Sequence, residues 1–145
     1  MKVSIASDHG GYELKEKVKK LLEKKAIEVK DFGTDSLESC DYPDFGRPAA
    51  QAVADKEVDF GILICTTGIG MSMVANKIKG VRAALCADTV SAVLTRQHNN
   101  ANVLVMGAGI VGNNLAFSIV EAFLTTDFSY EEKHERRINK IENLD

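Results

Sequence analysis

The sequence predicts an α/β fold in which a parallel sheet is covered by helices on both faces. Short apolar or β-branched runs alternate with longer segments of helical periodicity, as in repeated βα units. One run, residues 60–65, is continuously apolar, which is typical of a central strand buried on both faces. With 145 residues the chain is expected to form one domain, residues 1–145.

The expected elements follow one another without an internal repeat or low-complexity segment. In the first helix, Leu14, Val18, Leu21 and Leu22 form one apolar stripe, and Lys and Glu occupy the other side. Residues 30–45 are rich in turn formers, and an irregular segment of this length suggests a functional loop. The expected strands are residues 3–6, 27–29, 60–65, 81–86 and 102–106, and the expected helices after the first are residues 46–56, 71–77, 88–97, 113–124 and 131–144.

The last expected helix is highly charged and carries only a narrow apolar seam, formed by Ile138, Ile141 and Leu144. Such a seam suits packing on a neighbour, which could be another subunit. Lys133 and Arg137 are four residues apart and therefore lie on one face. The simplest interpretation is a solvated face, but the two cations would clamp a phosphate if that face docked over a site.

Composition excludes several classes of protein. The net charge is −3, so the chain as a whole does not attract nucleic acid or an anionic membrane. No apolar run approaches the ~18 residues of a membrane span, and Met1 leads directly into a strand-like segment, so a cytoplasmic location is expected. The three cysteines lack the paired spacing of a metal site or a disulfide framework.

Polar residues follow several of the expected strands and helices. Asp8 and His9 come after the first strand, Cys65 ends the third, and His98 with Asn99 ends a helix. Ligands of an open parallel sheet bind at the carboxyl ends of its strands, so these residues are expected to share that edge. A strand order beginning 2-1-3 would bring Asp8 and His9 beside the loop after the third strand. The alternative for residues 98–100 is a helix C-cap with Asn in the left-handed conformation.

Two glycine-rich loops invite different interpretations. Gly68 and Gly70 allow backbone N–H groups to point inward at a helix N-terminus, a geometry that binds an anion and favours a thiolate at Cys65. Residues 107–112 match the pattern G-x-G-x-x-G of dinucleotide-binding proteins. The strand with a terminal acidic residue that should follow this pattern is missing, so a tight turn and close packing explain these glycines better.

A set of motifs that spans almost the whole chain resembles the type B ribose-5-phosphate isomerases and the related galactose-6-phosphate isomerases. The motifs are Ser-Asp-His-Gly at residues 7–10, Asp-Tyr-Pro at 41–43, and residues 61–65, 67–70, 75–77, 80–83, 96–99 and 102–104. The resemblance implies a Rossmann-like three-layer α/β/α sandwich with a five-stranded parallel sheet. It also implies an enzyme without metal or nucleotide cofactor, assembled as a dimer or a dimer of dimers, in which the C-terminal helix packs on a partner subunit and two chains complete each site.

The resemblance further implies a reaction, the interconversion of ribose 5-phosphate and ribulose 5-phosphate through a cis-enediolate. Cys65 would take the carbon-bound proton, Thr67 would assist proton movement between the oxygens, and His98 would open the sugar ring. The residues implied to bind the sugar are Asp8, His9, Thr66, Gly68, Ile69, Gly70 and Asn99, and those implied to bind the phosphate are His9, Lys133 and Arg137.

Three positions depart from the family pattern. Lys133 stands where Arg is usual, Gly109 stands where some members have a phosphate-binding Arg, and Thr66 stands where Gly is usual. Lysine offers a point charge in place of a bidentate clamp, so Arg136 is an alternative phosphate ligand.

Two other functions are weighed against this one. A six-carbon substrate, galactose 6-phosphate or allose 6-phosphate, is the alternative within the enzyme class. A non-catalytic sugar-phosphate-binding module is the alternative outside it, although a pure binder needs neither Cys65 nor His98.

Overall fold

Five strands form one parallel sheet in the computed structural model, which describes residues 1–144. The strand order is β2-β1-β3-β5-β4, and all four neighbouring pairs are parallel. The strands are β1 (Lys2–Ser7), β2 (Glu28–Asp31), β3 (Phe60–Cys65), β4 (Ala83–Leu85) and β5 (Val103–Gly107). The predicted α/β class and the predicted start of the strand order are confirmed.

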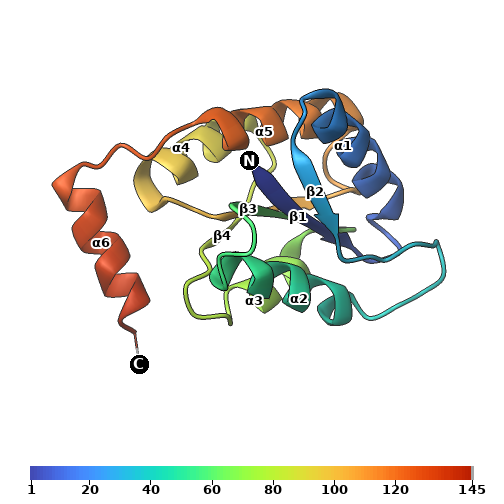
Figure 1. Cartoon of the computed structure of the whole chain (residues 1–145), viewed down its shortest axis with the longest axis horizontal. Coiled ribbons are helices and arrows are strands. Elements are labelled where there is room, and N and C mark those ends of the chain that lie inside the picture. The colour runs from blue at the N-terminus through green and yellow to red at the C-terminus, as the bar shows by residue number, and fades with distance from the viewer. Residues whose placement is uncertain (145) are drawn as a thin grey trace.

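Helices cover both faces of the sheet (Figure 1). On one face α1 (Tyr12–Lys24), α4 (Thr89–Asn99) and α5 (Asn113–Thr125) pack against the strands, and on the other face α2 (Tyr42–Ala54) and α3 (Ile69–Ala75) do so. The last helix, α6 (Glu132–Glu142), lies apart from both layers, on the side of α4. None of the helices within residues 1–144 is both long and apolar enough to cross a membrane.

The central strand β3 shows why its sequence is continuously apolar. Ile62 and Ile64 belong to the core on the α1 and α5 side, whereas Leu63 and Cys65 belong to the core on the α2 and α3 side. All four residues are at most 5% exposed. Each fully buried aliphatic side chain stabilises the fold by about 1.5–3 kcal/mol, so β3 anchors both layers.

Several element boundaries differ from the prediction, and two of these differences have a clear physical cause. The helix expected at residues 46–56 begins at Tyr42, because Pro43 lies in its first turn, where the missing N–H costs nothing. The strand expected at residues 81–86 is limited to β4, because side chains satisfy the backbone before it. The N–H of Arg82 donates to Asn102 Oδ1 and the N–H of Ala83 to Asn76 Oδ1.

Lys15 departs from the expectation that the lysines of α1 form a solvated face. It is 1% exposed, and its Nζ lies 2.8 Å from both carboxylate oxygens of Asp31 at the end of β2. Lys19 also pairs with Asp31, at 2.7 Å. Burial raises the pKa of Asp31, but hydrogen bonds from Lys15, Lys19 and the Gly33 N–H outweigh it and hold that pKa below its ordinary value.

Asp31→Asn is expected to destabilise the fold by about 3 kcal/mol at pH 7, because Lys15 would keep a buried charge without its main partner. Since the folded-state pKa of Asp31 is lowered, its contribution is present above the ordinary carboxyl pKa and is lost as the pH falls through the folded-state value. The free energy of unfolding in urea should therefore differ between variant and wild type at pH 7, and this difference should be smaller at pH 3. The exposed Asp35→Asn serves as the control, and a difference of constant size would contradict this account.

Candidate active site

The carboxyl ends of β1 and β3 bring two predicted site residues together. The strands are neighbours, and the N–H of Asp8 donates to the carbonyl of Ile64 at 3.3 Å. Asp8, which directly follows β1, and Cys65, which ends β3, therefore lie at the same edge. Asp8 is 7% exposed, and its Oδ1 accepts a hydrogen bond from the N–H of Gly11 at 3.1 Å. One buried carboxylate is thus held in place beside the cysteine strand.

The loop after β3 folds back onto the sulfur of Cys65. Gly68 has a φ of 79°, in the left-handed region, and its N–H donates to Cys65 Sγ at 3.1 Å. The N–H of Ile69 donates to Thr67 Oγ1 at 3.2 Å. The turn into α3 is therefore fixed by hydrogen bonds to the side chains of Cys65 and Thr67, the two predicted proton-transfer residues at this edge. The N–H of Gly70 has no hydrogen-bond acceptor within residues 1–144.

The glycines at the end of β5 support this loop from behind. A Cβ on Gly107 would lie 2.5 Å from the Thr67 carbonyl oxygen, so only glycine permits this approach. The N–H of Ala108 donates to the Cys65 carbonyl and that of Gly109 to the Thr66 carbonyl, both at 2.8 Å. The glycines of the G-x-G-x-x-G pattern therefore allow the loop after β5 to pack closely against the loop after β3, which is the interpretation that the sequence favoured.

His9 receives a contact that the sequence did not reveal. Its Nδ1 accepts a hydrogen bond from the backbone N–H of Cys40 at 3.2 Å, across 31 positions of sequence. An acceptor at Nδ1 places the proton of the neutral imidazole on Nε2, so the other side of the ring is a donor. The loop before α2 reaches this edge because Gly33 and Thr34 form backbone hydrogen bonds with Ser7.

A second group of predicted site residues lies at the opposite edge of the sheet. The carbonyl of Asn99 accepts a hydrogen bond from Arg82, which precedes β4. Asn99 and the adjacent His98 therefore lie near the amino ends of β4 and β5. The sequence-based placement of His98 and Asn99 at the carboxyl edge is wrong, because α4 runs back across the sheet and ends where the next strand begins. Asn100 has a φ of 45°, so the Asn cap weighed as the alternative is present.

His134 joins this second group, although no role was expected for it from the sequence. Its ring stacks on that of His98, with centroids 4.3 Å apart and planes at 17°. It is 6% exposed in an otherwise charged helix. Burial lowers the pKa of His134, the neighbouring basic side chains of His98, Lys133 and Arg137 lower it further, and Glu131 opposes them. Within residues 1–144, Lys133 pairs with Glu131 at 3.1 Å and Arg137 has no ion pair.

The two groups do not meet within one chain. The strand β5 has five residues, so the two edges of the sheet are about 15 Å apart. The carboxyl-edge group holds Asp8, His9, Cys65, Thr66, Thr67, Gly68, Ile69 and Gly70, and the amino-edge group holds His98, Asn99, Lys133, His134 and Arg137. Among residues 1–144, no three His, Cys, Asp or Glu side chains form a cluster suited to a metal ion.

The parallel sheet and the polar group at its carboxyl edge define an α/β protein whose candidate ligand site lies where the strand order reverses, between β1 and β3. Comparisons with known proteins show which family within this class the chain belongs to. The sequence model of the ribose/galactose isomerase family matches residues 3–141. The chain therefore belongs to that family.

Individual relatives agree with this assignment. A solved ribose 5-phosphate isomerase of Thermotoga maritima is 53% identical, with a TM-score of 0.96 over 99% of this chain and 98% of that one. Ribose-5-phosphate isomerase B of Escherichia coli is 44% identical over 97% of this chain and 93% of its own length. The structure of ribose-5-phosphate isomerase B from Mycoplasma genitalium, with bound ribulose-5-phosphate, is 43% identical, with a TM-score of 0.92 over 97% of this chain and 93% of that one.

Two glycine substitutions test how tightly the loop after β3 is held. Gly68 and Gly80 both have a left-handed φ, of 79° and 86°, but only a Cβ at Gly68 would meet other atoms, 2.5 Å from Leu85 Cδ1 and 2.9 Å from the carbonyl carbon of Met106. Gly80→Ala is expected to cost about 1 kcal/mol for the backbone conformation alone. Gly68→Ala should cost about 2–4 kcal/mol, because overpacking adds to that penalty. If urea unfolding shows that both variants lose the same free energy of unfolding, the loop after β3 rearranges around the added Cβ without further cost.

Proposed function

We propose that this chain is an aldose–ketose isomerase that interconverts ribose 5-phosphate and ribulose 5-phosphate through a cis-enediolate. The observation that carries the proposal is the sulfur of Cys65, held by the Gly68 N–H at 3.1 Å beside the buried Asp8. The family, and the ribulose-5-phosphate bound to the Mycoplasma genitalium relative, support the choice of substrate.

Proton transfer between two neighbouring carbons requires one base with access to both. In the proposed mechanism Cys65 removes the proton from C2 of the open-chain aldose and returns it to C1. The Gly68 N–H stabilises the sulfur while it is a thiolate. Thr67 moves the hydroxyl proton between O1 and O2, and the Gly70 N–H donates to the enediolate oxygen as its charge develops.

The remaining carboxyl-edge residues orient the sugar. Asp8 accepts hydrogen bonds from sugar hydroxyls, and Thr66 and Ile69 line the approach to the sulfur. His9 presents its Nε2–H to the phosphate, because Cys40 occupies Nδ1. Binding energy from the phosphate, which does not react, then helps to hold C1 and C2 near the base.

Ring opening and the rest of the phosphate site come from a second copy of the chain. His98 acts on the ring oxygen, Asn99 contacts the sugar, and Lys133 and Arg137 bind the phosphate, all from the partner. The two edges of one sheet are about 15 Å apart, so one copy alone cannot bring His98 to Cys65. This distance supports a site that is shared between two copies. Apolar side chains on and beyond α6, at Ile141 and Leu144, are 49% and 77% exposed, as expected of a surface that packs on another chain.

Cys65→Ala is expected to lower kcat for ribose 5-phosphate by about 10²–10⁴-fold, the usual contribution of a positioned base. Binding of the sugar phosphate, measured by calorimetry, should change little, because no predicted phosphate ligand is lost. Cys86→Ala is the matched control, since Cys86 is also buried but burial raises its pKa to about 11. Galactose 6-phosphate and allose 6-phosphate are assayed in parallel. Unchanged turnover in Cys65→Ala would exclude the mechanism.

Mixing two inactive variants tests whether sites are shared. Cys65→Ala and His98→Asn each remove one half of the proposed site. If subunits exchange at random, the mixture should recover about a quarter of the wild-type activity, because half of the dimers are mixed and each has one intact site. A double variant that carries both substitutions in every chain is the control and should stay inactive. Failure to recover activity after confirmed exchange would place both residues in the same site of one chain.

A further inference from the structure

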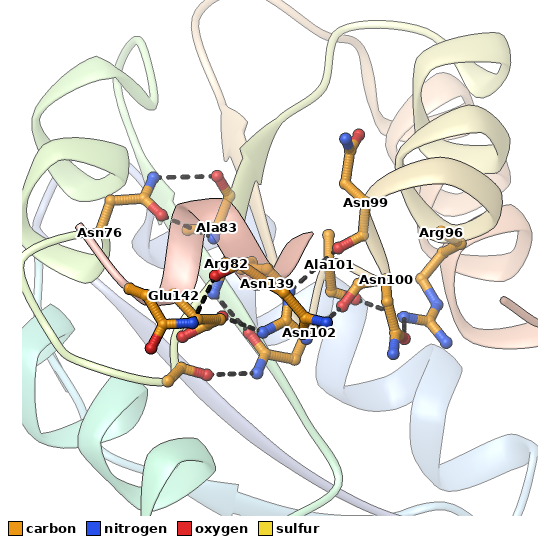
Figure 2. A network of polar contacts seen from close by, with 12 residues as sticks. Asn76, Arg82, Ala83, Arg96, Asn99, Asn100, Ala101, Asn102, Asn139 and Glu142 are labelled. Carbon is orange, nitrogen blue, oxygen red and sulfur yellow. Dashed lines mark hydrogen bonds and ion pairs between the residues drawn. The ribbon is translucent and has the colours of Figure 1, made fainter. Parts of the chain in front are cut away.

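Arg82 lies at the amino edge of the sheet, directly before β4, and no role follows for it from the sequence. Its side chain is 19% exposed, and three of its nitrogen atoms are engaged. Nε donates to the carbonyl of Asn99 at 3.0 Å, Nη2 donates to the carbonyl of Asn100 at 2.9 Å, and Nη1 pairs with the carboxylate of Glu142 (Figure 2). One guanidinium thus joins the end of α4 to the end of α6.

Two of these bonds fix the C-terminal turn of α4. Carbonyls at a helix C-terminus lack intrahelical donors and carry partial negative charge, so a cation is favourable there. Arg96 secures the same turn from the buried side, because Nη1 donates to Asn100 Oδ1 at 2.8 Å and to the Ala101 carbonyl at 2.6 Å. The turn includes Asn99 and directly follows His98, so two arginines determine where these residues lie.

The third bond fixes α6. Within residues 1–144, the Arg82–Glu142 pair is the only hydrogen bond or ion pair between α6 and a segment outside residues 129–144. A groove of about 720 Å³ is lined by residues 76–83 and by the end of α6, so packing does not replace the pair there. Near its start, α6 is held by the stack of His134 on His98. The two attachments are eight positions apart in sequence, about 12 Å along the helix.

We propose that Arg82 is a positioning residue that sets the place of α6 relative to the end of α4. It thereby aligns His98 and Asn99 with Lys133 and Arg137, while Arg82 itself contacts no substrate. The inference rests on the proposed function, which gives those four residues their roles towards a sugar phosphate. Arginine suits this task because its planar group donates in three directions, which the single ammonium of lysine cannot reproduce.

Steady-state kinetics with ribose 5-phosphate separate the effect of the bond between Arg82 and α6 from the effect of its bonds to α4. Glu142→Gln replaces the charged acceptor of Arg82 with a neutral amide, which weakens the attachment of the end of α6 and leaves both bonds of Arg82 to α4. KM should therefore rise about five- to tenfold with little change in kcat. Arg82→Lys loosens α4 as well, so kcat should also fall by about 10–100-fold, the cost of a catalytic group displaced by about 1 Å. Lys79→Gln is the matched control, because Lys79 is an exposed cation three positions away that forms no hydrogen bond or ion pair within residues 1–144, and it should match wild type.

Histidine NMR of the free protein supplies a second readout that does not depend on turnover. Stacked rings shift each other's proton resonances, so Glu142→Gln should move the His98 and His134 signals, and Lys79→Gln should not. If wild type is active and Glu142→Gln matches it in KM and in spectrum, the proposal is overturned and the proposed function stands. If wild type is inactive on every sugar phosphate, the proposed function fails, and an unchanged histidine spectrum in Glu142→Gln still overturns the positioning role. If Arg82→Lys does not fold, Glu142→Gln alone decides.

Discussion

All five strands run in the same direction, and this constraint governs where chemistry can occur. Each strand delivers its last residue to one edge, and each helix must return the chain to the other edge before the next strand begins. Residues that end or directly follow strands therefore gather at the carboxyl edge, as Cys65 and Asp8 do. Residues that end returning helices gather at the amino edge, as His98 does. A site that needs both kinds of residue must use two copies of the fold.

Backbone contacts, more than side chains, shape the carboxyl edge. The loop after β3 is bonded to the loop after β5 by two backbone hydrogen bonds of 2.8 Å, and Gly107 leaves room for the Thr67 carbonyl. A Cβ on Gly10 would lie 2.2 Å from Thr66 Oγ1, so the loop after β1 approaches equally closely. Three loops thus support one another, which keeps the sulfur of Cys65 in a defined position. Precise placement of this kind is what a proton-transfer step requires.

The sequence predicts those features that follow from local pattern. The apolar run of β3 predicted its central position, and the expected strand order predicted that Asp8 and Cys65 share an edge. The burial of Lys15 was missed because a buried lysine and an exposed one look alike in the sequence of an amphipathic helix. Only the carboxylate of Asp31 on β2 offsets the cost of burying its charge. His134 was missed for a similar reason, since its burial depends on a ring from α4. Long-range pairs of this kind leave no periodic signal.

The amino-edge group gathers several basic side chains, and such a cluster favours an anionic ligand. Burial lowers the pKa of His134, the neighbouring basic side chains of His98, Lys133 and Arg137 lower it further, and Glu131 opposes them. A bound phosphate would reverse that effect, because an anion favours the protonated imidazole. Protonation of His134 and binding of phosphate should therefore support each other. An anion bound there would stabilise the positive charge that α6 carries, so the proposed phosphate ligands Lys133 and Arg137 would act together with the stacked histidine pair.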